Sequence, residues 1–275
     1  MSYPTLLLHL AIGLPNEARL ASARYLAERF DALVIGAAAC DPQPPASFEG
    51  IYPPHVIVAD RGYAKEKLDA AQAEFRQAFA GRENRIEWRS AFAPPATWLA
   101  AQGRAADLVV TGAVKPELLA DPSWRLDPGE LVMRAGRPML LVPEARGPLG
   151  LGTVLVAWKD TREARRSVAD SLPLARLAER VLVASVAEDD DAGAAHAGAA
   201  DVVGWYHRHD IAAEMRALPL VTDPASQLRT LALDEGADVI VAGAYGHSRT
   251  REWVFGGVTH EFMTREASNH LMLSH

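Results

Sequence analysis

Near the end of the chain, four glycines have the spacing of an anion-binding loop. Residues 239–242 form an unbroken apolar run, typical of a central parallel strand that helices cover on both faces. Gly243 and Gly246 follow this run, and the pair 256–257 precedes a segment whose apolar spacing predicts a helix. Glycine lets the backbone approach a ligand closely, and the first N–H groups of a helix are unpaired donors at the positive end of its dipole. This order of strand, glycine loop and helix predicts a phosphate site.

The residues between the two glycine pairs also suit phosphate oxygens. Residues 247–251 (His-Ser-Arg-Thr-Arg) supply hydroxyl groups and two guanidinium groups. A solvated surface loop carries the same residue types, so that alternative stays open. Gly246 and Ser248 also nearly match the nucleophile elbow Gly-x-Ser-x-Gly of serine hydrolases, but the last glycine is missing and the predicted helix starts well after the serine. A serine hydrolase is therefore disfavoured.

The elements that position these residues alternate between strands and helices. A proline-rich stretch at 41–55 predicts a long surface loop. Strands that alternate with helices predict a parallel sheet with right-handed crossovers. In the first part of the chain we predict strands at 5–9, 32–38, 85–89, 107–112 and 138–143, and helices at 16–30, 63–79, 94–102 and 127–135.

The same order of elements then starts again, which indicates an internal duplication. Residues 153–158 correspond to residues 5–10 and precede a predicted helix at 162–177, and residues 238–241 correspond to residues 107–110. Leu140 and Leu271 are separated by the same number of residues as positions 107 and 238. The last quarter of each half therefore aligns without a gap. Proline and glycine cluster at 144–150, where we place the seam between the halves.

This alignment allows a test of the glycines within the chain itself. Glycines that served only the fold would be needed in both halves, but the first half retains one of the four. We therefore favour a ligand role for the set in the second half, and one site per chain. Gly243, Gly246, Gly256 and Gly257 align with Gly112, Lys115, Arg125 and Leu126.

The pattern Gly-x2-Gly-x9-Gly followed by a small residue, directly after an apolar strand, resembles the nucleotide-binding signature of the universal stress protein family. In that family the signature ends Gly-Ser or Gly-Thr, whereas here it ends Gly256-Gly257, with Thr259 two residues further on. The resemblance covers nearly the whole chain and implies an α/β fold of two tandem universal-stress-type (adenine nucleotide α-hydrolase-like) domains. Each would hold a five-stranded parallel sheet flanked by helices. The implied domains are residues 1–147, with a degenerate motif, and residues 148–275, with the intact spacing.

The resemblance also implies an adenine nucleotide (ATP, ADP or AMP) in the second domain, with Mg²⁺ as an optional companion. The family usually has Val-Asp-Gly-Ser after the first strand, where residues 157–161 here read Ala-Trp-Lys-Asp-Thr. Lys159 takes the place of the acidic residue that contacts the nucleoside, and Asp160 follows it. Asp160 or Thr161 could equally cap the next helix. The predicted nucleotide-binding residues are Ala157, Lys159, Asp160, Gly243, Gly246, His247, Ser248, Arg249, Gly256, Gly257, Val258 and Thr259; no catalytic or metal-binding residue is predicted.

Composition limits the remaining function classes. The chain has 275 residues, of which 49% are hydrophobic and 23% charged, as is usual for a globular protein. A net charge of −7 argues against nucleic-acid binding, and no apolar run reaches the roughly 20 residues that span a bilayer. The single cysteine, Cys40, excludes an intrachain disulfide and fits the cytoplasm.

From these features we expect a cytoplasmic stress-response protein that binds a nucleotide as a regulatory or sensor module. A weak ATPase and a ligand-free protein-interaction module are the alternatives. The protein partner is unknown, and we expect no nucleic-acid or membrane partner. In the family the fifth strands pair domains, which residues 138–143 and 270–275 would do within one chain, and a homodimer stays open.

Overall fold

The computed structural model describes residues 2–42, 54–112, 124–187, 192–244 and 269–275, and for residues 54–60 it describes the backbone alone. The first half of the chain, up to residue 142, alternates strands with helices as the sequence predicts. Its elements are β1 (Thr5–His9), α1 (Glu17–Phe30), β2 (Leu33–Cys40), α2 (Pro54–Ala78), β3 (Ile86–Phe92), α3 (Pro95–Gln102), β4 (Leu108–Gly112), α4 (Pro128–Ala135) and β5 (Met139–Val142).

A connection that contains the short 3₁₀ helix η5 (Glu144–Arg146) leads into the second half, in which the order of strands repeats. The domain boundary expected at 147/148 lies in this connection and stays a prediction. The elements of the second half are β6 (Thr153–Ala157), α5 (Arg162–Asp170), α6 (Leu172–Ala175), β7 (Arg180–Ala187), α7 (Ala192–Arg208), β8 (Ala213–Pro219), α8 (Pro224–Asp234), β9 (Val239–Gly243) and β10 (His270–Ser274).

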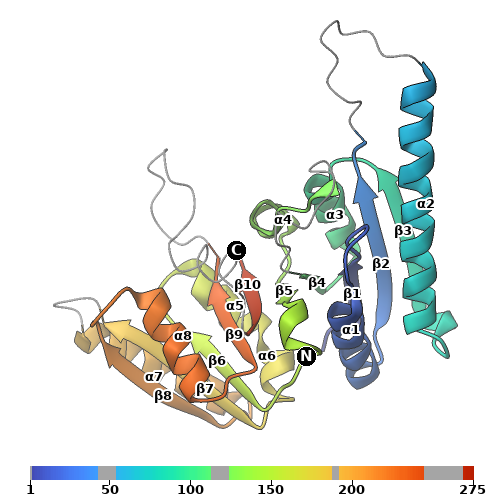
Figure 1. Ribbon diagram of the computed structural model, residues 1–275. Helices are drawn as coiled ribbons and strands as arrows, with labels where there is room; N and C mark the ends of the chain where they lie inside the picture. Colours follow the sequence, from blue (N-terminus) through green and yellow to red (C-terminus); the bar gives the residue numbers. More distant parts are fainter. Residues whose placement is uncertain (1, 43–53, 113–123, 188–191, 245–268) are drawn as a thin grey trace, which may run out of the picture.

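The ten strands in the described part of the chain form one continuous sheet in the order β3-β2-β1-β4-β5-β10-β9-β6-β7-β8. Within each half the strands are parallel, and β5 pairs with β10 in the antiparallel sense at the centre. Figure 1 shows the two halves side by side, joined where β5 meets β10. The fold is therefore α/β with two tandem five-stranded parallel sheets, and the predicted pairing of the fifth strands within one chain is confirmed.

Helices cover both faces of the sheet, which explains the continuous apolar runs in its strands. On one face, α1 and α2 in the first half and α5, α6 and α7 in the second pack into one apolar cluster. On the other face, α3, α4 and α8 pack into another. Strand residues alternate between these clusters, as the period of two requires, so Leu8 and Val156 face one layer and Leu7 and Leu155 the other.

Two elements differ from the sequence-based expectation. Helix α2 begins at Pro54, earlier than the predicted 63, because a proline in the first turn of a helix loses no hydrogen bond. The helix predicted over 162–177 is divided into α5 and α6, since Pro173 has no N–H to donate and instead lies in the first turn of α6. The proline-rich loop, apart from its ends, and the helix expected after Gly257 lie outside the described residues.

Candidate functional site

In an open α/β sheet, ligands bind beyond the carboxyl ends of the parallel strands. In the second half, β6 and β9 are neighbours, and Ala157 lies opposite Ala242 at this edge. Gly243 is the last residue of β9, and Lys159 and Asp160 lie exposed in the connection from β6 to α5. Of the other predicted site residues, Gly246, His247, Ser248, Arg249, Gly256, Gly257, Val258 and Thr259 lie outside the described residues.

The connection from β6 to α5 shows which of Asp160 and Thr161 caps the helix, a question that the sequence left open. Thr161 caps α5, because its Oγ1 accepts a hydrogen bond from the Ala164 backbone N–H at 3.1 Å. Asp160 instead forms an ion pair with Arg165, with 2.7 Å between Oδ1 and Nη2 and both side chains more than half exposed. Since Thr161 does the capping, the Asp160 carboxylate remains accessible to a ligand.

Gly243 has a packing role. A Cβ at this position would lie 2.6 Å from the backbone nitrogen of Ala164 and 2.7 Å from the carbonyl carbon of Glu163. Both atoms belong to the first turn of α5, which therefore rests directly on the end of β9. Close backbone approach is the reason that this position needs glycine.

The corresponding glycine of the first half is close-packed by a different group. A Cβ at Gly112 would lie 2.5 Å from Cζ of Arg19, whose guanidinium covers the end of β4. Arg19 is the third residue of α1, as Ala164 is the third residue of α5. The glycine shared by the two halves is thus required by the packing of the first helix in both.

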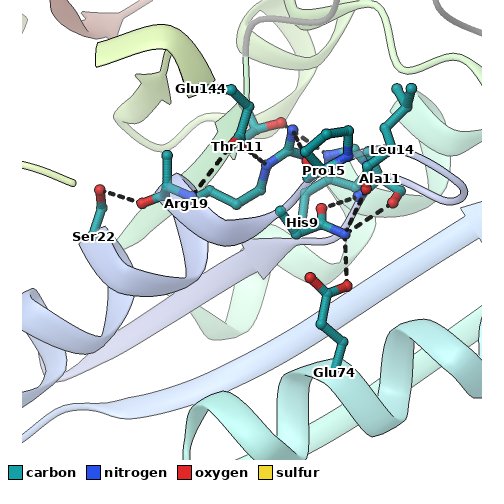
Figure 2. Close-up of polar contacts among 11 residues, drawn as sticks. His9, Ala11, Leu14, Pro15, Arg19, Ser22, Glu74, Thr111 and Glu144 are labelled. Carbon is teal, nitrogen blue, oxygen red and sulfur yellow. Dashed lines mark hydrogen bonds and ion pairs between the residues drawn. The ribbon is translucent and has the colours of Figure 1, made fainter. Parts of the chain in front are cut away.

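Two further matched positions differ between the two edges. Where the first half has His9 and Thr111, the second half has Ala157 and Ala242, because Leu8 pairs with Val110 in the same register as Val156 with Val241. Nδ1 of His9 lies 2.9 Å from Oγ1 of Thr111. Burial, together with the nearby positive charge of Arg19, lowers the pKa of His9 to about 3, so the ring is neutral. Figure 2 shows how these side chains and Arg19 fill the first-half edge.

Comparison with known proteins identifies this arrangement. No family model and no curated protein matches the sequence. A universal stress protein from Archaeoglobus fulgidus DSM 4304 superposes with a TM-score of 0.66 at 14% identity, covering 98% of this chain and 95% of that one. The chain has the universal stress protein fold.

Two further solved structures share the universal stress protein fold over almost the full chain. The first, described as a putative universal stress protein from Pseudomonas aeruginosa UCBPP-PA14, has a TM-score of 0.62 at 13% identity and covers 99% of this chain and 93% of its own. The second is a protein of unknown function from Pseudomonas aeruginosa PAO1, with a TM-score of 0.59 at 14% identity and coverage of 99% and 92%. The fold thus extends over both halves.

Within this fold, Glu163 is a candidate site residue that motif spacing did not indicate. It is the second residue of α5 and lies beside Gly243, with a side chain that is 3% exposed. It forms an ion pair with Arg162, while its Oε2 has no hydrogen-bond partner among the described residues.

The sequence contains a signal for the residues that it did not assign. The internal repeat aligns His9 with Ala157 and Thr111 with Ala242, so a comparison of the two halves position by position finds the differences. To find Arg19 from the sequence, α1 and α5 must be aligned as well, and the loop before each helix obscures that alignment. Only the structure brings Arg19 over Gly112.

In the described part of the chain, no helix is both long and apolar enough to cross a bilayer. The same residues contain no group of three histidine, cysteine, aspartate or glutamate side chains close enough to hold a metal ion.

Proposed function

We propose that this chain is a tandem member of the universal stress protein family, that it binds an adenine nucleotide at the C-terminal edge of its second half, and that it acts in the cytoplasm as a regulatory module in stress response. The match of the whole chain to universal stress protein structures supports the family. The glycine spacing supports a nucleotide in the second half.

The carrying observation is the difference in side-chain volume between the two edges. Ala157, Ala242 and Ala164 stand where the first half has His9, Thr111 and Arg19. At the ends of β6 and β9 the matched side chains of the second half are only methyl groups, and the backbone of α5 lies against Gly243. In the first half, an imidazole, a hydroxyl and a guanidinium stand at the matched positions. This contrast supports one nucleotide site per chain.

The roles follow from chemistry. Gly246, the polar residues 247–249 and residues 256–259 are proposed to hold the phosphates through backbone N–H groups and charged side chains. Residues 157–160 are proposed to face the nucleoside. Glu163 is proposed to accept a hydrogen bond from a ribose hydroxyl, because its carboxylate beside Gly243 is unsuited to a phosphate contact.

The first test uses the first half as a template. The double variant Ala157→His/Ala242→Thr places the side chains of the first-half edge in the second half, and the reciprocal variant is His9→Ala/Thr111→Ala. We expect the first variant to weaken ATP binding by at least about tenfold, and the second to leave it unchanged. Titration of ATP, with and without Mg²⁺, followed by fluorescence or calorimetry, measures both. Equal loss in the two variants would place the site elsewhere.

A second test identifies the ligand. Small molecules released on denaturing freshly purified protein are analysed by mass spectrometry, for the wild type and for Gly246→Leu. We expect adenine nucleotide from the wild type only. Phosphate released steadily from added ATP would favour the weak ATPase, and the Ser248→Ala variant would then test the loop. No released nucleotide together with no thermal shift on adding ATP would favour the ligand-free interaction module.

A further inference from the structure

The first-half edge contains an ion pair between a buried arginine and a half-buried carboxylate. Arg19 has a side chain that is 2% exposed, and its Nε donates to Oε1 of Glu144 at 3.2 Å. Glu144 is distant from α1 in the sequence and opens η5, in the connection between the two halves. Figure 2 shows the Glu144 carboxylate lying over the Arg19 guanidinium.

The same carboxylate binds the N-terminus of α1. Oε2 of Glu144 accepts a hydrogen bond from the Ala18 backbone N–H at 3.1 Å. The N-cap residue Asn16 does not cap the helix, because its side-chain oxygen accepts from the Ala11 N–H instead. Helix α1 is 14 residues long, and the positive end of its dipole therefore meets the carboxylate of a distant residue.

Arg19 has donors to spare. A guanidinium offers five N–H groups, and besides the bond to Glu144, Nη2 of Arg19 donates to the Pro15 carbonyl oxygen at 3.3 Å. Nη1 is buried and has no hydrogen-bond partner among the described residues. A buried cation with unused donors at a helix N-terminus is a receptor for negatively charged oxygen atoms.

We propose that the first half contains a compact oxyanion site, formed by the Arg19 guanidinium and the N-terminus of α1, and that the Glu144 carboxylate is its internal ligand. An external oxyanion, either a carboxylate or a phosphate group, competes with Glu144 for Arg19 and the Ala18 N–H. The site takes one anion at a time, because the negative charges of Glu74 and Glu17 also act on Arg19 and oppose a second negative charge.

Displacement of Glu144 by an external anion would also affect the connection to the second half. Two residues after Glu144, Nη2 of Arg146 donates to the Ala237 carbonyl and to Oδ1 of Asp238, both at 3.1 Å. The connection is thus tied to the first half through Glu144 and to the second through Arg146. An external anion that displaces Glu144 releases the first tie and leaves the second, so the site links anion binding to the joint between the halves.

The experiment is a chemical rescue of the variant Glu144→Ala. Thermal unfolding is followed in sodium chloride, sodium formate and sodium phosphate at equal ionic strength and equal pH. We expect the unfolding midpoint of Glu144→Ala to fall by several degrees in chloride, and formate or phosphate to restore part of that loss with a saturable concentration dependence. The anion with the larger effect distinguishes a carboxylate site from a phosphate site.

Two further variants make the test decisive. Glu28→Ala removes an exposed carboxylate that pairs with Arg24 on the same helix, and together with the wild type it reports the general stabilisation by these salts and any phosphate bound in the second half. Arg19→Met/Glu144→Ala removes both partners of the ion pair and leaves no buried charge unpaired, so it should fold but lose the rescue. Equal anion effects in Glu144→Ala and the wild type, or rescue that persists without Arg19, would overturn the proposal.

Discussion

At the end of β1 the first half has His9, and at the same register the second half has Ala157; one strand away, Thr111 in the first half corresponds to Ala242 in the second. Above these pairs the first half places the Arg19 guanidinium, where the second half has the backbone of α5 itself. The sheet and its register are the same, but one edge is filled by its own polar side chains and the other is lined by alanine.

Other matched positions have not diverged. Asp107 accepts a hydrogen bond from the Thr5 N–H at 2.8 Å, and Asp238 accepts from the Thr153 N–H at 3.3 Å. Gly112 and Gly243 are both close-packed by the first helix of their half. Residues needed by the fold persist in both copies, so the positions that differ at the same edge report function.

The largest expected effect separates the two glycines. Gly243→Ala places a Cβ against the α5 backbone, which can move only with the helix, and should destabilise the protein by about 3 kcal/mol or more. Gly112→Ala meets the guanidinium of Arg19, the end of a longer side chain, and should cost about 1 to 2 kcal/mol. Urea unfolding of both variants measures the difference.

A second change tests the cause of the smaller effect. Arg19→Met/Glu144→Gln removes the charged group over Gly112, and in this background Gly112→Ala should be less destabilising than in the wild type, while Gly243→Ala should be unaffected. Equal losses for both glycines in the wild type would show that the two edges are packed alike, contrary to the comparison.

Much of the fold follows from local pattern. The apolar runs at 5–9 and 239–242 and the repeat of element order predicted parallel sheets in two tandem halves, and the pairing of β5 with β10 followed from the family resemblance. Prolines were harder to interpret, since Pro54 opens a helix and Pro173 divides one. Both depend on whether the missing N–H would have been bonded, which single-sequence patterns do not reveal.

The candidate site was less predictable than the fold, because its first-half counterpart is built from contacts distant in sequence. Arg19 reaches Glu144 across 125 positions, and no spacing rule connects them. The ligand role of the glycines after Gly243 stays a prediction, whereas Gly243 itself has a packing reason that the sequence comparison only suggested by retaining Gly112.

Acid should destabilise the folded protein through two buried histidines, of which His9 lies at the first-half edge. Burial lowers the pKa of His9 to about 3 and that of His270, in β10, to about 4, both below the ordinary value of 6.5. Between those values and 6.5 the unfolded chain binds more protons than the folded one, so stability falls as pH decreases through this range. At pH 5, each histidine should destabilise the protein by about 2 kcal/mol relative to pH 8.

Substitution assigns the acid effect to each histidine. His9→Asn should reduce the loss of unfolding free energy between pH 8 and pH 5 by about half, and His270→Asn by a similar share. His196→Asn, at an exposed position of α7, should leave it unchanged. Denaturant titrations at several pH values give the slopes. A slope in His9→Asn equal to that of the wild type would mean that His9 is not the group that acid charges at the first-half edge.

The smallest expected effect separates the cap from the ligand contact at the second-half edge. Thr161→Ala removes the side-chain oxygen that accepts from the Ala164 N–H and should destabilise the protein by about 1 kcal/mol. Asp160→Ala breaks only an exposed ion pair with Arg165 and should change stability by less than about 0.5 kcal/mol. If Asp160 faces the nucleoside as proposed, however, the Asp160→Ala variant should weaken ATP binding more than Thr161→Ala does. The opposite order in the binding titration would return Asp160 to a purely structural role and remove it from the proposed nucleoside contacts.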